Sequence, residues 1–158
     1  MGLSLTSTAF KDGAPIPVVY TCDGADRSPP LSWRGVPEGT GAFALIVDDP
    51  DAPGRTWVHW VLYDLPASLD GLPEDVSKVE APRELGGAVQ GKNDSRKVGY
   101  GGPCPPPGPA HRYFFKLYAL AAPLGLKPGA SKQEVEQAMG GHVLATAQVM
   151  GTYARQRR

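Results

Sequence analysis

The sequence predicts a single, mostly β domain with a few helices near its C-terminus. Three segments rich in β-branched and aromatic residues, each bounded by Pro or Gly, are typical of strands. The 17 prolines and 20 glycines fall largely between such segments, where they favour turns. A helix-capping pattern occurs near the C-terminus. At 158 residues the chain is long enough for one hydrophobic core, so we expect one domain spanning residues 1–158.

The strands predicted for the centre of the sheet are "GAFALIVDD" (41–49), "TWVHWVLYDL" (56–65) and "RYFFKLYALA" (112–121). Alternating positions of the third segment are apolar on both faces, which favours a strand in the middle of a packed sheet. Weaker strand patterns occur at 3–10, 17–22 and 31–33.

Two helices are predicted near the C-terminus. Ser131 followed by Glu134 fits a capping box at the start of a helix over 131–139. After two glycines, apolar residues recur at helical spacing and predict a second, amphipathic helix; these are Val143, Leu144, Ala147 and Met150. Residues 154–158 form a short basic tail that we expect to be solvated.

The charge balance excludes two classes of partner. Sixteen basic and sixteen acidic residues cancel, so no global field attracts the chain to nucleic acid or to an anionic membrane. No apolar run approaches the roughly 20 residues that span a bilayer, and the N-terminal residues lack the pattern of a signal peptide. We expect a soluble, cytoplasmic protein that does not insert into membranes.

The two cysteines, Cys22 and Cys104, lie far apart in polar, Pro/Gly-rich surroundings. Their spacing fits neither a zinc site nor a redox pair. In a reducing cytoplasm we expect two free thiols, with one long-range disulfide as the alternative.

The segment "DDPDAPGRTWVHW" (48–60) places several titratable side chains around one predicted turn. Folding of this turn would bring His59 back toward Asp49 and Asp51, and His111 opens another predicted strand. These residues could hold a divalent metal, perform acid and base catalysis or bind an anion. Alternatively, the aspartates only cap a tight turn and the histidines are ordinary core residues.

Residues 80–110 form the longest stretch without periodicity. Loops of this length inside a compact domain are usually functional or disordered. The sequence contains no glycine-rich nucleotide-binding motif.

Three separated motifs resemble the phosphatidylethanolamine-binding protein family, also called Raf-kinase-inhibitor-like proteins. They are "DPDAPGR" with the following "WVHW", "YGGPCPPPGPAHRY" (100–113), and "YTCDGADRSPPLSW" (20–33), which is similar to the bacterial and archaeal branch. The resemblance implies a large central antiparallel sheet, flanked by a smaller sheet on one side and by helices on the other.

The resemblance also implies a small surface cavity that binds phosphate-like anions without a metal or an organic cofactor. Carried over by position, its ligand-binding residues are Asp49, Asp51, Pro53, His59, Gly102, His111 and Tyr113. Prolines would fix the backbone so that the carboxylates face the imidazoles. Asp49 would hold a histidine in its charged form or share a proton with a monoprotonated phosphate oxygen. We expect anion binding to weaken as the pH rises through about 6 to 7.

The function expected from this resemblance is binding, not catalysis, with a regulatory or inhibitor-like role. Its ligand would be a phospholipid headgroup, a phosphorylated small molecule or a phosphorylated or carboxylate-bearing protein group; a protein target is not specified, and a homodimer is suggested. The alternative is a hydrolase or lyase in which His59 and His111 act as acid and base near Asp49. No recognisable nucleophile motif accompanies them.

Overall fold

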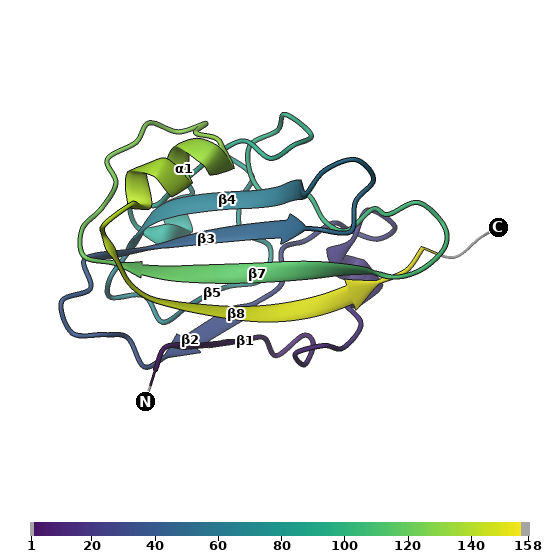
Figure 1. Cartoon of the computed structure of the whole chain (residues 1–158), viewed down its shortest axis with the longest axis horizontal. Helices are drawn as coiled ribbons and strands as arrows, with labels where there is room; N and C mark the ends of the chain where they lie inside the picture. Colours follow the sequence, from purple (N-terminus) through teal and green to yellow (C-terminus); the bar gives the residue numbers. More distant parts are fainter. Residues whose placement is uncertain (1, 156–158) are drawn as a thin grey trace.

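Two antiparallel sheets form the protein, as seen in a computed structural model that describes residues 2–155 (Figure 1). The large sheet has the order β6-β4-β3-β7-β8 and the small sheet the order β1-β2-β5. The strands are β1 (Ser4–Thr6), β2 (Leu31–Arg34), β3 (Ala42–Asp49), β4 (Trp57–Pro66), β5 (Gly71–Leu72), β6 (Val89–Gln90), β7 (His111–Leu120) and β8 (Val143–Tyr153). The helical elements are η1 (Val18–Tyr20), η2 (Arg83–Leu85) and α1 (Lys132–Met139). The mostly β fold with a large and a smaller sheet is confirmed.

The three strongest strand predictions correspond to β3, β4 and β7, which lie side by side in the large sheet. Every residue of β3 is buried, because both of its faces are covered. One face packs toward the small sheet, where the rings of Trp33 and Phe43 lie 5.2 Å apart. The other face packs against α1, where Ile46 contacts the cluster that contains Val135. Residues on the first face therefore point into the space between the sheets.

The predicted capping box at the start of α1 is confirmed. The Glu134 N–H donates to Ser131 Oγ at 3.1 Å, and the Ser131 N–H donates to Glu134 Oε1 at 3.0 Å. Lys132 then ties the start of the helix to the buried Asp48 of β3, with an Nζ to Oδ2 distance of 2.8 Å. The helix is thus fixed on the sheet by a local signal and by an ion pair.

The second predicted helix is wrong, because residues Val143–Tyr153 form the edge strand β8. This strand pairs antiparallel with β7 along its length, from Leu120↔Val143 to His111↔Tyr153. Its apolar positions fit both helical and strand periods, and pairing with the long β7 decides between them. Of the helices expected near the C-terminus, α1 is therefore the one that forms within residues 2–155.

The weaker strand predictions have mixed outcomes. Residues 31–33 lie in β2, whereas in 3–10 only Ser4–Thr6 is a strand. The predicted strand over 17–22 is wrong, since Pro17 precedes the 3₁₀ turn η1. Of the basic tail, Arg155 pairs with Asp23 at 3.1 Å, and residues 156–158 lie outside the described part of the chain.

The expectation of two free thiols is also wrong. Cys22 and Cys104 form a disulfide, with Cα atoms 5.4 Å apart and a sequence separation of 82. The fold brings together two loops whose proximity cannot be predicted from their sequence separation. The long-range bridge, the alternative drawn from the sequence, is the observed state.

No helix between residues 2 and 155 is both long enough and apolar enough to cross a bilayer.

Candidate functional site: a cavity at the end of the large sheet

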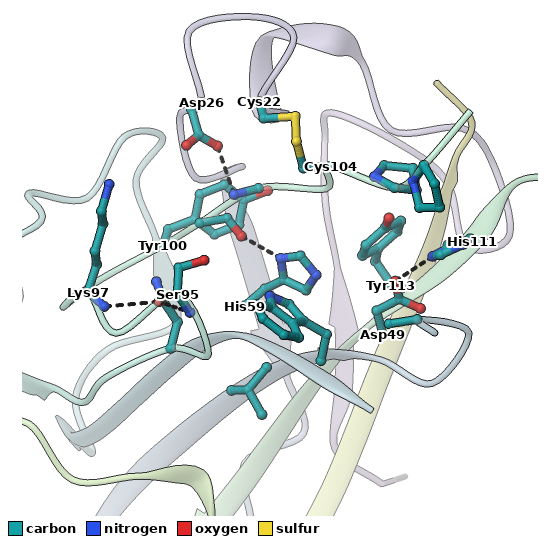
Figure 2. Close-up of a pocket in the computed structure, with 18 of the residues that line it drawn as sticks. Cys22, Asp26, Asp49, His59, Ser95, Lys97, Tyr100, Cys104, His111 and Tyr113 are labelled. Atoms are coloured by element: carbon teal, nitrogen blue, oxygen red, sulfur yellow. Dashed lines mark hydrogen bonds and ion pairs between the residues drawn. A yellow bond between two sulfur atoms is a disulfide. The ribbon is translucent and has the colours of Figure 1, made fainter. Parts of the chain in front are cut away.

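A cavity of about 850 Å³ lies where β3 ends and where β4 and β7 begin (Figure 2). Asp49 is the last residue of β3, and Tyr113 follows His111 by two positions on β7. Asp49 and Tyr113 belong to the strand faces that point between the two sheets, since Val47 and Phe115 lie in the core on that side. The cavity is therefore the open end of the space between the sheets.

His59 reaches the same cavity because β4 carries a bulge at that residue. In the pairing of β3 with β4, Val47 pairs with Trp60 and Asp48 pairs with Val58, which leaves His59 as the extra residue. A bulge of this kind turns a side chain away from the regular alternation. The free backbone groups of His59 are satisfied in part by Gly101, whose N–H donates to the His59 carbonyl at 2.9 Å.

Asp49 and His111 form a hydrogen-bonded pair at the rim of the cavity. His111 Nδ1–H donates to Asp49 Oδ2 at 2.7 Å, and the side chains are 12% and 4% exposed. The other carboxylate oxygen of Asp49 accepts the Asp51 N–H at 2.7 Å, which fixes the turn after β3. Both oxygens of Asp49 are thus engaged, while Nε2 of His111 makes no hydrogen bond to any described residue.

His59 is held in a defined tautomer. Its Nδ1–H donates to the carbonyl oxygen of Gly101 at 2.7 Å, so Nε2 is the nitrogen without a protein partner in the described chain. Burial lowers the pKa of His59, and this effect outweighs the opposing hydrogen bond to Gly101 and the charge of Asp49. The Asp49 carboxylate raises the pKa of His59, as expected, but burial lowers it more, so His59 is not the histidine that Asp49 holds in its charged form.

Tyr113 lies between the two histidines. Its ring packs edge-on against His59 with centroids 5.2 Å apart, and it stacks with His111 at 6.4 Å. Burial raises the pKa of Tyr113, and the nearby Asp49 carboxylate raises it further, so the phenol stays protonated. The hydroxyl is buried and makes no hydrogen bond of ordinary geometry within residues 2–155, although the Asp49 carboxylate lies close enough to act on it.

Asp51, in contrast, does not line the cavity. Its carboxylate accepts three hydrogen bonds from Arg112, each at 2.9 Å, two from the guanidinium and one from the backbone. The side-chain hydrogen bond to Arg112 lowers the pKa of Asp51 to about 2. Asp51 therefore fixes the turn after β3 to the start of β7. Pro53, in the same turn, lines the cavity as expected.

Gly102 lines the cavity, but its N–H is already used. It donates to Asp26 Oδ1 at 2.7 Å. A Cβ at this position would approach the Tyr20 carbonyl oxygen to 2.3 Å, so only glycine fits. Gly102 thus lets the glycine-rich loop pack closely on the segment that carries Asp26.

Sequence reasoning missed several residues that line the same cavity. Asp26 accepts the Gly102 N–H, and Lys78 lies 3.5 Å from its carboxylate. Asn93 lines the wall and donates to the carbonyl of Gly99 at 3.0 Å. Asp26 lies inside the "YTCDGADRSPPLSW" motif, so the motif could have identified it as a cavity residue. Lys78 and Asn93 belong to loops with no distinctive sequence pattern.

The metal alternative finds no support in the geometry. No group of three or more His, Cys, Asp or Glu side chains in the described chain is arranged to hold a metal ion. The side chains that converge are instead hydrogen-bond donors and acceptors on apolar walls.

Comparison with known proteins agrees with the resemblance seen in the motifs. A family model described as phosphatidylethanolamine-binding protein matches residues 6–154. A protein of Methanothermobacter thermautotrophicus, named UPF0098 protein, is 54% identical over 153 residues, which cover 97% of this chain and 99% of that protein. A UPF0098 protein of Aquifex aeolicus is also 54% identical, over 155 residues that cover 97% of this chain and 89% of that protein.

Two solved structures share the fold over nearly the whole chain. A phosphatidylethanolamine-binding protein homologue from Chlamydia trachomatis has 41% identity and a TM-score of 0.89, covering 98% of this chain and 99% of that one. Escherichia coli YbcL, described as a member of the mammalian family, has 36% identity and a TM-score of 0.92, covering 99% and 100%. The chain belongs to the phosphatidylethanolamine-binding protein family.

Proposed function

We propose that this protein binds a phosphate-like anion in the cavity formed by Asp49, His59, His111 and Tyr113. The observation that carries the proposal is the buried Tyr113 hydroxyl, which makes no hydrogen bond of ordinary geometry in the described chain and belongs to a ring that lies between two histidines. A buried donor without an acceptor costs free energy. An anion that accepts this hydrogen bond would remove that cost.

The histidines supply the remaining contacts. His59 and His111 each use Nδ1 for a protein hydrogen bond, and Nε2 of each has no partner among residues 2–155. A protonated imidazole would donate from Nε2 to an anion, and a neutral one would accept a hydrogen bond at Nε2 from the hydroxyl of a monoprotonated phosphate. Asp49 does not oppose such a ligand strongly, because His111 and the turn N–H occupy both of its oxygens.

The walls favour a phosphate attached to a larger body. The cavity, at about 850 Å³, is far larger than inorganic phosphate needs. Trp57 and Pro53 give it apolar surface, and the exposed Lys97 at its edge makes no ion pair within residues 2–155. The shared ligand chemistry is a phosphate monoester or diester; a phospholipid headgroup, a phosphorylated small molecule and a phosphorylated protein group all carry it.

The test is calorimetric titration of inorganic phosphate into the wild type and into His111→Asn. The asparagine amide retains a donor to Asp49 and removes Nε2, so we expect saturable binding by the wild type and affinity at least about tenfold weaker in the variant. His142→Asn is the matched control, since His142 is exposed and does not line the cavity. Binding that His111→Asn leaves unchanged would contradict the proposal.

Catalysis by the same residues is the second candidate. The Asp49–His111 pair is the observation that favours it, because a carboxylate that orients an imidazole is a common acid–base arrangement. Neither cavity histidine, however, hydrogen-bonds a serine, threonine or cysteine side chain in the described chain. We therefore expect no turnover of a panel of phosphoesters and peptides. Turnover that disappears in His59→Asn would show that the protein is an enzyme and would contradict a function in binding alone.

The cytoplasmic location, the homodimer and a protein target stay predictions from the sequence. A regulatory role would follow if the phosphate-bearing ligand were part of another protein, and pull-down with a phosphorylated peptide library, repeated with His111→Asn, would identify one.

A further inference from the structure

The disulfide between Cys22 and Cys104 is part of the cavity wall. Both cysteines line the cavity, and Figure 2 shows their sulfur bridge at the same cavity as His59 and Tyr113. Cys104 is exposed, whereas Cys22 is half-buried. A thiol in solution can therefore approach the Cys104 side of the bond.

No hydrogen bond among residues 2–155 holds the wall that follows Cys104, and Pro105 is its one buried residue. Residues 104–110 contain four prolines, which have no N–H to donate, and none of these residues makes a hydrogen bond to another part of the described chain. Pro105 and Pro106 of this stretch line the cavity. The disulfide is thus the one cross-link, within residues 2–155, between this wall and the neighbouring loop.

The flanking backbone is anchored independently of the disulfide. On one side, the Cys22 N–H donates to the Pro103 carbonyl at 3.1 Å, and the Tyr100 hydroxyl donates to the Tyr20 carbonyl at 2.7 Å. On the other side, β7 begins at His111. Cleavage of the bond would therefore release residues 104–110 and leave the two sheets intact.

We propose that the Cys22–Cys104 disulfide is a thiol-exchange site that acts as a reducible latch on the cavity. In the oxidised protein it holds the Pro105–Pro106 wall against the bound ligand, and its reduction loosens this wall and weakens anion binding. The effect on binding rests on the proposed function; the release of the wall does not.

The exchange step is an ordinary two-electron reduction by a dithiol. A thiolate of the dithiol attacks the exposed Cys104 Sγ, the bond to Cys22 breaks, and Cys22 leaves as a thiolate that takes up a proton. The second thiol of the reductant, as its thiolate, then attacks its own sulfur in the mixed disulfide. Cys104 leaves as a thiolate and is protonated, and the dithiol ends as a cyclic disulfide.

Anion binding and reduction of the disulfide should disfavour each other by the same factor. If reduction weakens anion affinity by a given factor, bound anion must shift the reduction equilibrium by that factor. Phosphate should therefore protect the disulfide from a dithiol at equilibrium, and it should do so less in His111→Asn.

The experiment compares wild type in its oxidised form, wild type reduced by dithiothreitol, and the double variant Cys22→Ser/Cys104→Ser. Phosphate affinity is measured by calorimetry, and backbone NMR order parameters are measured at Cys104, Gly108 and Ala110. We expect at least about fivefold weaker affinity and lower order parameters at these residues in the reduced protein. The chain has two cysteines, so the double variant should match the reduced protein and should not respond to dithiothreitol.

Each contrary result has a distinct meaning. Equal affinity together with equal order parameters in the two redox states would overturn the latch. Loss of the amide-exchange protection of β3 and β7 would also overturn it, since reduction would then unfold the domain instead of releasing one wall. If neither redox state binds phosphate, the proposed function fails, and the order parameters of residues 104–110 alone decide whether reduction releases the wall.

Discussion

The Tyr113 hydroxyl is the residue-scale feature on which anion binding depends most. It is buried between two imidazole rings and makes no hydrogen bond within the described chain. Leaving such a group unpaired costs about 1–3 kcal/mol. The rings of His59 and His111 pack against Tyr113, and Nε2 of each also makes no hydrogen bond to a described residue, so the cavity holds several unused hydrogen-bonding groups.

The change Tyr113→Phe separates a binding role from a structural one. Without ligand, we expect the free energy of unfolding to stay the same or to rise by up to about 1 kcal/mol, because an unsatisfied polar group is removed. Phosphate affinity should fall about tenfold or more, since the lost hydrogen bond is to a charged ligand. Urea unfolding and calorimetry measure the two effects; a variant that is less stable yet binds normally would show that Tyr113 serves packing alone.

His59 makes stability depend on pH in a defined direction. Its folded-state pKa is lowered by burial, so below the unfolded value of about 6.5 the unfolded chain binds more protons than the folded one. The stability present above that pH is therefore lost as the pH falls through the lowered folded-state pKa. In His59→Asn, which retains a donor to Gly101, we expect a flatter profile of unfolding free energy between pH 5 and 8.

Anion binding should have the reverse dependence on pH. A protonated His59 can donate from Nε2 to an anion, so affinity should rise as the pH falls below about 6.5. Sulfate is the suitable probe, because its own charge does not change in this range. Sulfate affinity that is constant from pH 5 to 8 would mean that neither cavity histidine changes protonation on binding.

At the scale of elements, two segments near the C-terminus show why one prediction succeeds and another fails. Helix α1 is specified locally, by a capping box between Ser131 and Glu134. Strand β8 is specified by its partner, since it is paired along its length with β7. A helical spacing of apolar residues without a cap was therefore weak evidence, and the long-range pairing prevailed.

Ser131→Ala tests the local specification of α1. Loss of the N-cap should lower the free energy of unfolding by about 1 kcal/mol. Thr, which retains the hydroxyl, should restore most of it. Phosphate affinity should not change in either variant, because Ser131 does not line the cavity; chemical denaturation and calorimetry on the same samples check both statements.

For the whole molecule, the sequence predicts the architecture better than it predicts how the cavity is assembled. Residues Asp49, His59, His111 and Tyr113 are found through their motifs, and the fold brings them together. The bulge that turns His59 toward the cavity depends on the pairing of two strands, which no local pattern reveals. The disulfide and the contact between Asp26 and Gly102 likewise join segments that are distant in sequence.

The measurement that tests the central claim most directly is a crystal structure determined with and without phosphate. We expect tetrahedral density in the cavity, within hydrogen-bonding distance of the Tyr113 hydroxyl and of Nε2 of His59 and His111, with Asp49 still bonded to His111. A cavity that holds no anion at saturating phosphate, or an anion bound only elsewhere on the surface, would contradict the claim.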